Sequence, residues 1–265
     1  MKLYSTLIIL LLPLLLAAQL NQTDSSGERH GLWEKQYPNG KMMYEGHFEH
    51  GTPIGEWKRY HGGGQIKAII NYSEKSDSAF TQLYGKQGKK IAEGNYIDQQ
   101  KAGRWTYFSG EEVIAEEHFS GGQKHGLSRK YYDSGELLET TEWKHGKREG
   151  DHEVFYKNGK PFMQCKFSND QRNGLCLSYF ENERIEMKAY YKNSLRHGHW
   201  KFYNQDGDHL YTLKYDEGEI LNPEVRDSID NLQMQNLEEG RQKILDPEKF
   251  LQDPSEYMRK MNVYR

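Results

Sequence analysis

Histidines are the first residues of this chain that could do chemistry, because three of them recur in one local pattern. His30, His125 and His197 each stand directly before a glycine, as the ligands of a repeated metal site would. They fall in widely separated stretches of the sequence, so no single ion could join them. His197 and His199 lie near each other but would hold a metal only weakly. The sequence therefore predicts no metal site.

Carboxylates give no catalytic arrangement. Glu111, Glu112, Glu116 and Glu117 form an acidic cluster, which we expect to be a solvated edge. The sequence contains no zinc-protease His-Glu pair, phosphate-binding glycine loop, nucleophile elbow or Cys-x-x-Cys. We therefore predict that the protein is not an enzyme, has no catalytic residue and uses no cofactor.

Cys165 and Cys176 are the only cysteines. They lie on two consecutive predicted strands, and if Phe167 lies opposite Gly174, the cysteines also lie opposite each other. A cross-strand disulfide is then geometrically possible. The alternative interpretation is that two small apolar side chains fill sites taken by Gly, Ala or Leu elsewhere. Both interpretations fit the sequence equally.

A repeat positions all of these residues. A pattern of about 24 residues occurs eight times between His30 and Leu221. Each repeat starts with a small residue, in most cases has a second glycine nine positions later, and closes on an aromatic residue. The starting residues are Gly31, Gly55, Ala79, Gly103, Gly126, Gly150, Gly174 and Gly198. Such self-similarity predicts an array in which each unit buries its apolar face only against its neighbours.

Each repeat is predicted to be a β-hairpin. In the first repeat, Leu32–Tyr37 is the outgoing strand, Asn39-Gly40 the turn and Lys41–Phe48 the return strand. Asn and Gly both tolerate the positive φ angles of a type I′ turn. We expect each closing aromatic residue to lie opposite the starting glycine of the next repeat, where its ring can cover a residue without a Cβ atom.

Alternation along the return strands predicts two unlike faces. Tyr44, Gly46 and Phe48 share one face with the tryptophans of the outgoing strands. In every repeat after the first, the opposite face carries an aromatic residue five positions after the start, which we expect to pair with the residue at the twelfth position. The candidate binding aromatics are Trp33, Trp57, Trp105 and Trp200 on the first face and Tyr60, Tyr84, Tyr131 and Tyr203 on the second.

The predicted fold class is an all-β repeat array, an elongated antiparallel meander of about eight β-hairpins with a short α-helical C-terminal cap. We assign residues 1–18 to a signal peptide, 19–29 to a flexible leader, 30–221 to the repeat domain and 222–265 to the helical cap. Asn222-Pro223-Glu224 is typical of a helix start. The helix is expected to cover the open edge of the last hairpin, and a partner-binding or oligomerisation helix is the alternative.

The N-terminus predicts export. Lys2 precedes the apolar run Leu7–Leu16, and Ala17 and Ala18 supply small residues for cleavage. An uncleaved anchor is the competing interpretation, but the run is shorter than the roughly 20 residues of a spanning helix. We expect a periplasmic or extracellular protein, where a disulfide can persist.

The repeats resemble the MORN repeat (membrane occupation and recognition nexus). The residues that carry the likeness are Gly31-Leu32-Trp33, Asn39-Gly40-Lys41, Gly46-His47-Phe48, His125-Gly126-Leu127 and His197-Gly198-His199-Trp200. The likeness covers residues 30–221 and is strongest to the bacterial variant, often grouped with the antitoxin components of toxin–antitoxin modules. MORN arrays mostly mediate protein or lipid contacts, so the resemblance implies binding.

Charge narrows the choice of partner. The formal net charge is −3, which gives no basic footprint for nucleic acid and makes an anionic lipid surface an unexpected ligand. We predict a non-enzymatic exported scaffold that binds another protein through its aromatic side chains. The alternatives are an antitoxin or immunity protein and a module that binds glycans of the cell wall.

Overall fold

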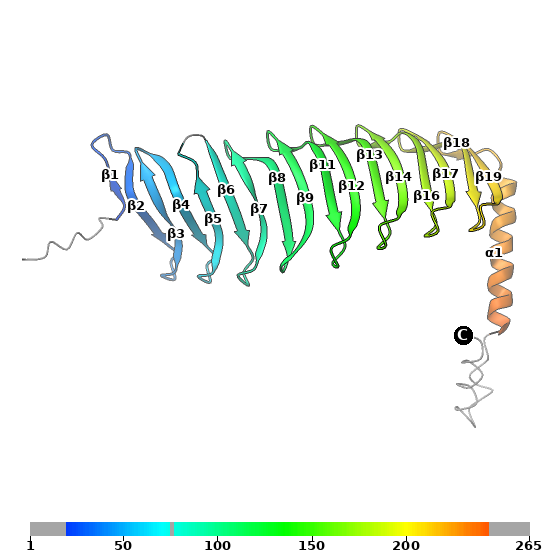
Figure 1. The fold of residues 1–265 in the computed structure, drawn as a ribbon, viewed down its shortest axis with the longest axis horizontal. Helices are drawn as coiled ribbons and strands as arrows, with labels where there is room; N and C mark the ends of the chain where they lie inside the picture. The colour runs from blue at the N-terminus through cyan, green and yellow to red at the C-terminus, as the bar shows by residue number, and fades with distance from the viewer. Residues whose placement is uncertain (1–19, 75–76, 244–265) are drawn as a thin grey trace, which may run out of the picture. The chain divides into compact units, whose positions relative to one another are not determined.

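The computed structural model describes residues 20–74 and 77–243. These residues form 20 β-strands and one α-helix, and they divide into two compact units. One unit contains the residues up to Glu149 together with Lys157–Gly159, and the other contains Gly150–Tyr156 and the residues from Lys160 onward. Within each unit the strands lie side by side in chain order and pair antiparallel (Figure 1).

The first unit contains strands β1 to β12. Their bounds are β1 (Gln22–Thr23), β2 (Arg29–Gln36), β3 (Met42–Glu49), β4 (Thr52–Tyr60), β5 (Ile66–Tyr72), β6 (Ser78–Tyr84), β7 (Lys90–Ile97), β8 (Gln100–Ser109), β9 (Glu112–Ser120), β10 (Gln123–Lys124), β11 (Gly126–Tyr131) and β12 (Leu137–Lys144).

The second unit begins within β13, at Gly150, and ends with the helix. Its elements are β13 (Lys147–Phe155), β14 (Pro161–Ser168), β15 (Gln171–Arg172), β16 (Gly174–Tyr179), β17 (Ile185–Lys192), β18 (Leu195–Tyr203), β19 (His209–Asp216), β20 (Glu219–Ile220) and α1 (Pro223–Lys243). The predicted array of eight antiparallel hairpins followed by a C-terminal helix is confirmed.

The register within each hairpin places the closing aromatic residue opposite the starting glycine of its own repeat. Gly31 pairs with Phe48, and Gly198 pairs with Tyr215. The prediction that the aromatic residue faces the next repeat's glycine is wrong, since Phe48 lies opposite Pro53, two residues before Gly55.

A bulge at the starting glycine causes this shift. Gly55 and Gly198 have φ angles of 63° and 68°, and the pairing with the preceding strand shifts beside each of them. An L-residue rarely adopts such a backbone. The third repeat supports this explanation, because it starts with Ala79, has no shift, and there Tyr72 does pair with Ala79.

The turn within a hairpin and the turn between two hairpins have different geometries. The type I′ turn predicted within the first hairpin, at Asn39-Gly40, is found between hairpins instead. Gly40 has a φ of 79° and its N–H donates to the Tyr37 carbonyl at 2.9 Å, while Asn39 keeps a negative φ. This is a type I turn closed by a glycine bulge. The type I′ geometry occurs instead between repeats, as at His50 and Gly51, with φ angles of 46° and 77°.

The glycine bulge also changes the pairing on the return strands. Tyr84 lies opposite Lys90, and Tyr203 lies opposite His209. The expected partners, Ile91 and Leu210, stand one position further on. The predicted pairing of the fifth with the twelfth position is therefore corrected to the eleventh.

The segment expected to be a flexible leader is ordered from Leu20. Strand β1 pairs with β2, with Gln22 opposite His30. The indole nitrogen of Trp33 donates to the Gln22 carbonyl at 2.9 Å, and Asn21 Oδ1 accepts from the Glu34 N–H at the same distance. These bonds hold the segment across the edge of β2, which explains why it does not behave as a linker.

Helix α1 begins at Pro223, as the sequence predicts. Val225 and Ile229 pack against the buried cluster of the second unit, so the first turns of the helix cover its last hairpin. Asn222 does not cap the helix with its side chain, since its Oδ1 accepts from the Lys214 N–H at 2.7 Å. Farther along, Leu232 is 59% exposed. Within the described residues no helix has the length and apolarity to cross a membrane. The predicted signal peptide and residues 244–265 lie outside the described residues.

Glu183 provides a test of the turn geometry, because it occupies the glycine position of the seventh repeat with a φ of 66°. We expect Glu183→Gly to raise the free energy of unfolding by about 1 kcal/mol, because glycine adopts this conformation without steric cost. The variant loses only an exposed ion pair of 3.1 Å with Lys160. Urea denaturation measures the change, and Glu183→Ala, which keeps the strain, is the matched control. Equal stability of the glycine and alanine variants would contradict the explanation.

Candidate functional site

One face of the strands is filled by tryptophan side chains that lie on small residues of the preceding repeat. Trp57 covers Gly46 so closely that an added Cβ atom would lie 2.1 Å from the indole, and Trp105 covers Gly94 in the same way, at 2.5 Å. Trp57 is 5% exposed and Trp105 is fully buried. We call this side of each unit the tryptophan face, and it forms the core.

The indole nitrogens are also used in this packing. Trp57 donates to the His47 carbonyl at 3.0 Å, and Trp105 donates to the Asn95 carbonyl at 3.0 Å. Trp200 donates to the Tyr190 carbonyl at 2.9 Å. Each tryptophan therefore binds the strand of the preceding repeat through both its ring surface and its N–H group.

Burial corrects three of the eight binding residues proposed from sequence. Trp57, Trp105 and Trp200 lie in the core and have no free ring surface to offer a ligand. Trp33 is half-buried, with Arg29 stacked 4.9 Å from its ring centroid. Alternation identified the face correctly but could not show that the tryptophans cover their neighbours.

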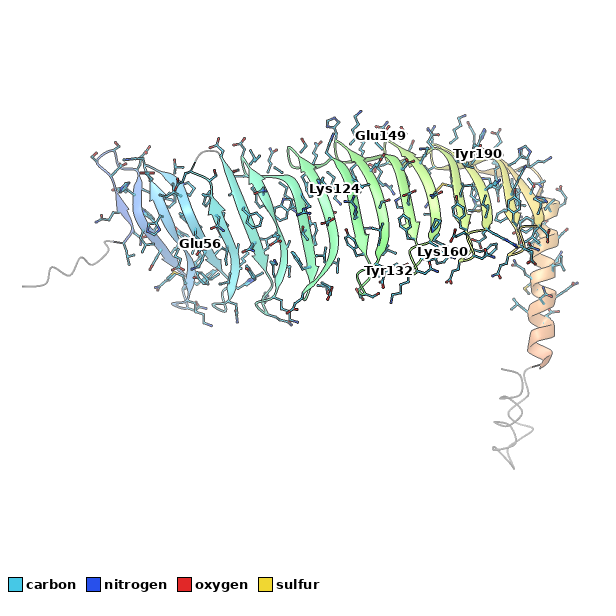
Figure 2. The ribbon with its side chains drawn as sticks, viewed as in Figure 1. Glu56, Lys124, Tyr132, Glu149, Lys160 and Tyr190 are labelled. Carbon is cyan, nitrogen blue, oxygen red and sulfur yellow. A yellow bond between two sulfur atoms is a disulfide. The ribbon has the colours of Figure 1, made fainter. Side chains whose placement is uncertain are left out.

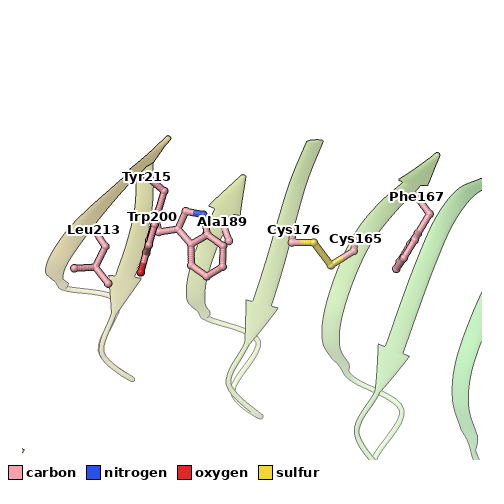
Figure 3. Close-up of a cluster of buried hydrophobic side chains, with 7 residues drawn as sticks. All are labelled: Cys165, Phe167, Cys176, Ala189, Trp200, Leu213 and Tyr215. Carbon is pink, nitrogen blue, oxygen red and sulfur yellow. A yellow bond between two sulfur atoms is a disulfide. The ribbon is translucent and has the colours of Figure 1, made fainter. Parts of the chain in front are cut away.

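The disulfide Cys165–Cys176 occupies the place of one such tryptophan contact. Cys176 stands two residues after its repeat start, where Trp200 stands in the next repeat, and Cys165 corresponds to Ala189. The two cysteines are bonded, and Figure 3 shows the disulfide beside Ala189 and Trp200 within one buried cluster. The cross-strand disulfide, one of the two interpretations left open by the sequence, is confirmed, and it lies where small apolar residues stand in other repeats.

The tyrosines proposed from sequence lie on the opposite side of the strands, which we call the open face. Tyr60 donates to Glu45 Oε1 at 2.6 Å, and Tyr131 donates to Glu116 Oε2 at 3.0 Å. Tyr84 donates to Gln82 at 3.4 Å, within its own repeat. All are half-buried. The tyrosines of the open face thus join neighbouring repeats as well as facing solvent.

Two members of the acidic cluster predicted to be a solvated edge are half-buried, Glu116 on the open face beside Tyr131 and Glu117 on the tryptophan face opposite Trp105, whereas Glu111 and Glu112 are exposed as predicted. Glu117 accepts a hydrogen bond from Tyr107 at 2.8 Å and forms an ion pair with Lys124. The side chains of Glu116 and Glu117 are only 19% and 18% exposed. These two carboxylates therefore take part in holding neighbouring strands together.

Two of the hollows in the described surface are large, and each lies within a single unit. One lies on the tryptophan face, has a volume of about 690 Å³ and includes Ala79, Thr81 and Leu83 in its lining. It forms at the third repeat, where Thr81 replaces the tryptophan. An apolar side chain of a ligand could enter it.

The other hollow lies on the open face of β16, β17 and β18 and has a volume of about 770 Å³. We call it the β17 groove. Leu175, Leu177, Ile185 and Tyr190 supply its apolar lining. Leu175 is 36% exposed and Tyr190 49% exposed, and Tyr190 is labelled on β17 in Figure 2.

The β17 groove also contains an unfavourable pair of charges. Lys188 and Lys201 both line it and lie directly opposite each other on β17 and β18. Like charges in such a pair destabilise a sheet. Neither ammonium group has an ion-pair partner among the described residues.

The corresponding positions carry opposite charges at two other places in the array. Glu45 lies opposite Lys58, and Glu116 lies opposite Arg129, with 3.8 Å between the carboxylate and the guanidinium group. The groove is therefore a local departure from the repeat. Sequence reasoning missed it, although comparing the fourteenth position of each repeat with the third position of the next would have found it.

The sequence comparisons identify the repeat but no characterised relative. Residues 29–50, 53–74, 124–145, 148–169 and 172–193 match the family described as MORN repeat variant. The chain therefore contains repeats of this type, as the resemblance implied. No curated protein matches the chain, and nothing supports the resemblance to antitoxins.

One solved structure illustrates how far the structural similarity goes. The crystal structure of a TarM mutant from S. aureus in complex with fondaparinux, alpha-GlcNAc-glycerol and UDP has 17% sequence identity and a TM-score of 0.18. The match covers 41% of this chain but only 19% of that one. A likeness at this level carries no argument about fold or function.

Alkaline pH tests the hydrogen bond between Tyr60 and Glu45. Burial, followed by this bond, raises the pKa of Tyr60 from its ordinary 10.0 to about 12. The unfolded chain therefore loses the phenolic proton first, and the stability contributed below pH 10 is lost as pH rises from 10 to 12. We expect Tyr60→Phe to make the free energy of unfolding fall less over this range, measured by urea denaturation. An identical pH slope in wild type and variant would contradict this assignment.

The equivalence of the disulfide and the tryptophan contact is testable by exchange. Replacing both cysteines by serine should cost about 3 kcal/mol, the value expected for a loop of this length. Cys165→Ala with Cys176→Trp copies the Ala189 and Trp200 pair and should recover a large part of that loss. Denaturation under non-reducing conditions compares the two double variants. Stability of the tryptophan variant at or below that of the serine variant would refute the equivalence.

Proposed function

We propose that this protein is a non-enzymatic, exported scaffold that binds a partner protein through the β17 groove. The observation that carries the proposal is the pair Lys188 and Lys201, opposite each other and without a carboxylate partner in the described part of the chain. Such a pair is unfavourable by roughly 0.2–1 kcal/mol in the free protein. A ligand carboxylate between the two ammonium groups turns the repulsion into attraction.

The partner segment is acidic and apolar. The cations of the groove stand beside Leu175 and Tyr190, which are large side chains with exposed apolar surface. His199 adds a further group that can carry positive charge. Aromatic anchors and desolvated charge pairs dominate the energetics of protein interfaces. A segment that alternates Glu or Asp with Leu fits both features.

The remaining functions considered from sequence have less support. Glycan binding was expected to use exposed Trp and Tyr platforms, but Trp57 and Trp105 are buried. The repeated aromatic and carboxylate side chains take part in packing and hydrogen bonding, which leaves few residues for catalysis. The Cys165–Cys176 disulfide supports export, because such bonds persist in oxidising compartments.

The variant Lys188→Glu separates binding from folding. It copies the charge pair of Glu45 and Lys58, so we expect the free energy of unfolding to rise by about 0.5 kcal/mol. An octapeptide of alternating Glu and Leu, labelled for fluorescence anisotropy, should bind the wild-type chain and bind the variant at least about tenfold more weakly. Lys86→Glu is the matched control, since Lys86 is exposed in a turn of the first unit and makes the same change of net charge.

Two further measurements fix the chemistry of the ligand. The same peptide with Lys in place of Glu should not bind. Added salt should weaken the binding of the acidic peptide to the groove. Equal binding of the two peptides, or unchanged binding by Lys188→Glu, would contradict the proposal. Sedimentation with phosphatidylserine vesicles but no peptide binding would show that the groove recognises a lipid surface instead.

A further inference from the structure

The N-terminal repeat brings together three side chains of the types that ligate transition metals. Asp24 follows β1, His30 lies in β2 and His50 lies in the turn between β3 and β4. One ligand atom from each lies within 4.8 Å of the other two. The sequence pattern relates His30 only to other histidines that precede glycines, and His50 lies outside that pattern. Asp24 was expected to belong to the flexible leader, residues 19–29.

The fold holds these residues in place from separate elements. Asp24 Oδ1 accepts hydrogen bonds from the backbone N–H groups of Ser26 and Glu28, at 2.8 and 3.0 Å. Its other oxygen, Oδ2, lies 2.7 Å from His50 Nδ1. The His30 and His50 rings are 5.1 Å apart between centroids. The carboxylate is therefore fixed by one oxygen while the other points toward the histidines.

The surroundings favour a cation. Glu28 and Glu49 add negative charge around His50. His30 and His50 are exposed, so their rings can adjust to the ligand separation of about 3.4 Å that tetrahedral Zn²⁺ requires.

We propose that Asp24, His30 and His50 form a binding site for a divalent transition metal of the Zn²⁺ class. Two imidazoles and one carboxylate are donors that suit such ions, and three protein ligands leave a position for water. The ion would join the turn after β1 to the turn between β3 and β4. The site would thus fasten the first strand of the array and is independent of the β17 groove.

A second histidine pair in the same chain provides an internal comparison. His125 and His145 occupy the same repeat positions as His30 and His50, and their ring centroids are 5.3 Å apart. Among the described residues, only the first pair has a third ligand close enough to form a group of three. Asp24 therefore distinguishes a three-ligand site from a pair of stacked rings.

Isothermal titration of the full chain with ZnCl₂, in buffer free of chelators, tests the proposal. We expect one ion to bind per chain, and we expect Asp24→Asn, His30→Gln and His50→Gln each to weaken binding at least about tenfold. Asp24→Asn keeps an oxygen that can accept from Ser26 and Glu28, so it preserves the turn. His125→Gln should leave the affinity unchanged.

Thermal unfolding provides the second measurement. Zn²⁺ should raise the Tm of the wild-type chain and of His125→Gln, because a ligand that binds only the folded state stabilises it. It should not raise the Tm of the three site variants, whose folding is checked by circular dichroism in EDTA. Absence of Zn²⁺ binding, or an equal loss of affinity in His30→Gln and His125→Gln, would overturn the proposal.

Discussion

The structure depends on one contact, the placement of a large side chain of one repeat on a small residue of the repeat before it. Apart from the first turns of α1, neither a helix nor a second sheet covers the described strands, so most of the core must form within the single layer. Trp57 on Gly46 and Trp105 on Gly94 supply that core, and the indole N–H groups add hydrogen bonds to the preceding strand. The starting glycine makes this possible, because its positive φ shifts the strand register beside the ring.

Because each contact involves only two adjacent repeats, the array tolerates a different solution at each step. The disulfide replaces the tryptophan contact between Cys165 and Cys176. At the third repeat the tryptophan is lost, Ala79 removes the bulge, and a hollow opens beside Thr81. Departures from the repeat therefore mark places where the tryptophan contact is lost or replaced. At these places the side chains differ from those of the other repeats.

The hairpins, their number and the start of the helix could be predicted from the sequence, because these follow from periodicity and from the positions of glycine and proline. The register between paired strands could not. Asn39-Gly40 and His50-Gly51 both look like type I′ turns, and only the hydrogen bonding of Gly40 distinguishes them. The burial of Trp57 could not be predicted either, because alternation assigns a residue to a face of the strands but does not show which side chains cover that face. The Lys188 and Lys201 pair could have been found, because the expected register already places those residues opposite each other.

The tryptophan face forms the core and the open face faces solvent, and this difference explains on which face a binding site can form. On the tryptophan face a change of residue must preserve a fitted contact, so most substitutions there cost stability. On the open face the side chains contribute less to packing, and charge can vary between repeats at small cost. Glu45 with Lys58 and Lys188 with Lys201 occupy equivalent positions, yet the first pair attracts and the second repels. Equivalent pairs such as Ile69 with Gln82 and Gln164 with Leu177 carry no like charges, so the repulsion is specific to the β17 groove. A ligand carboxylate would remove this repulsion, which is why we propose the groove as the binding site.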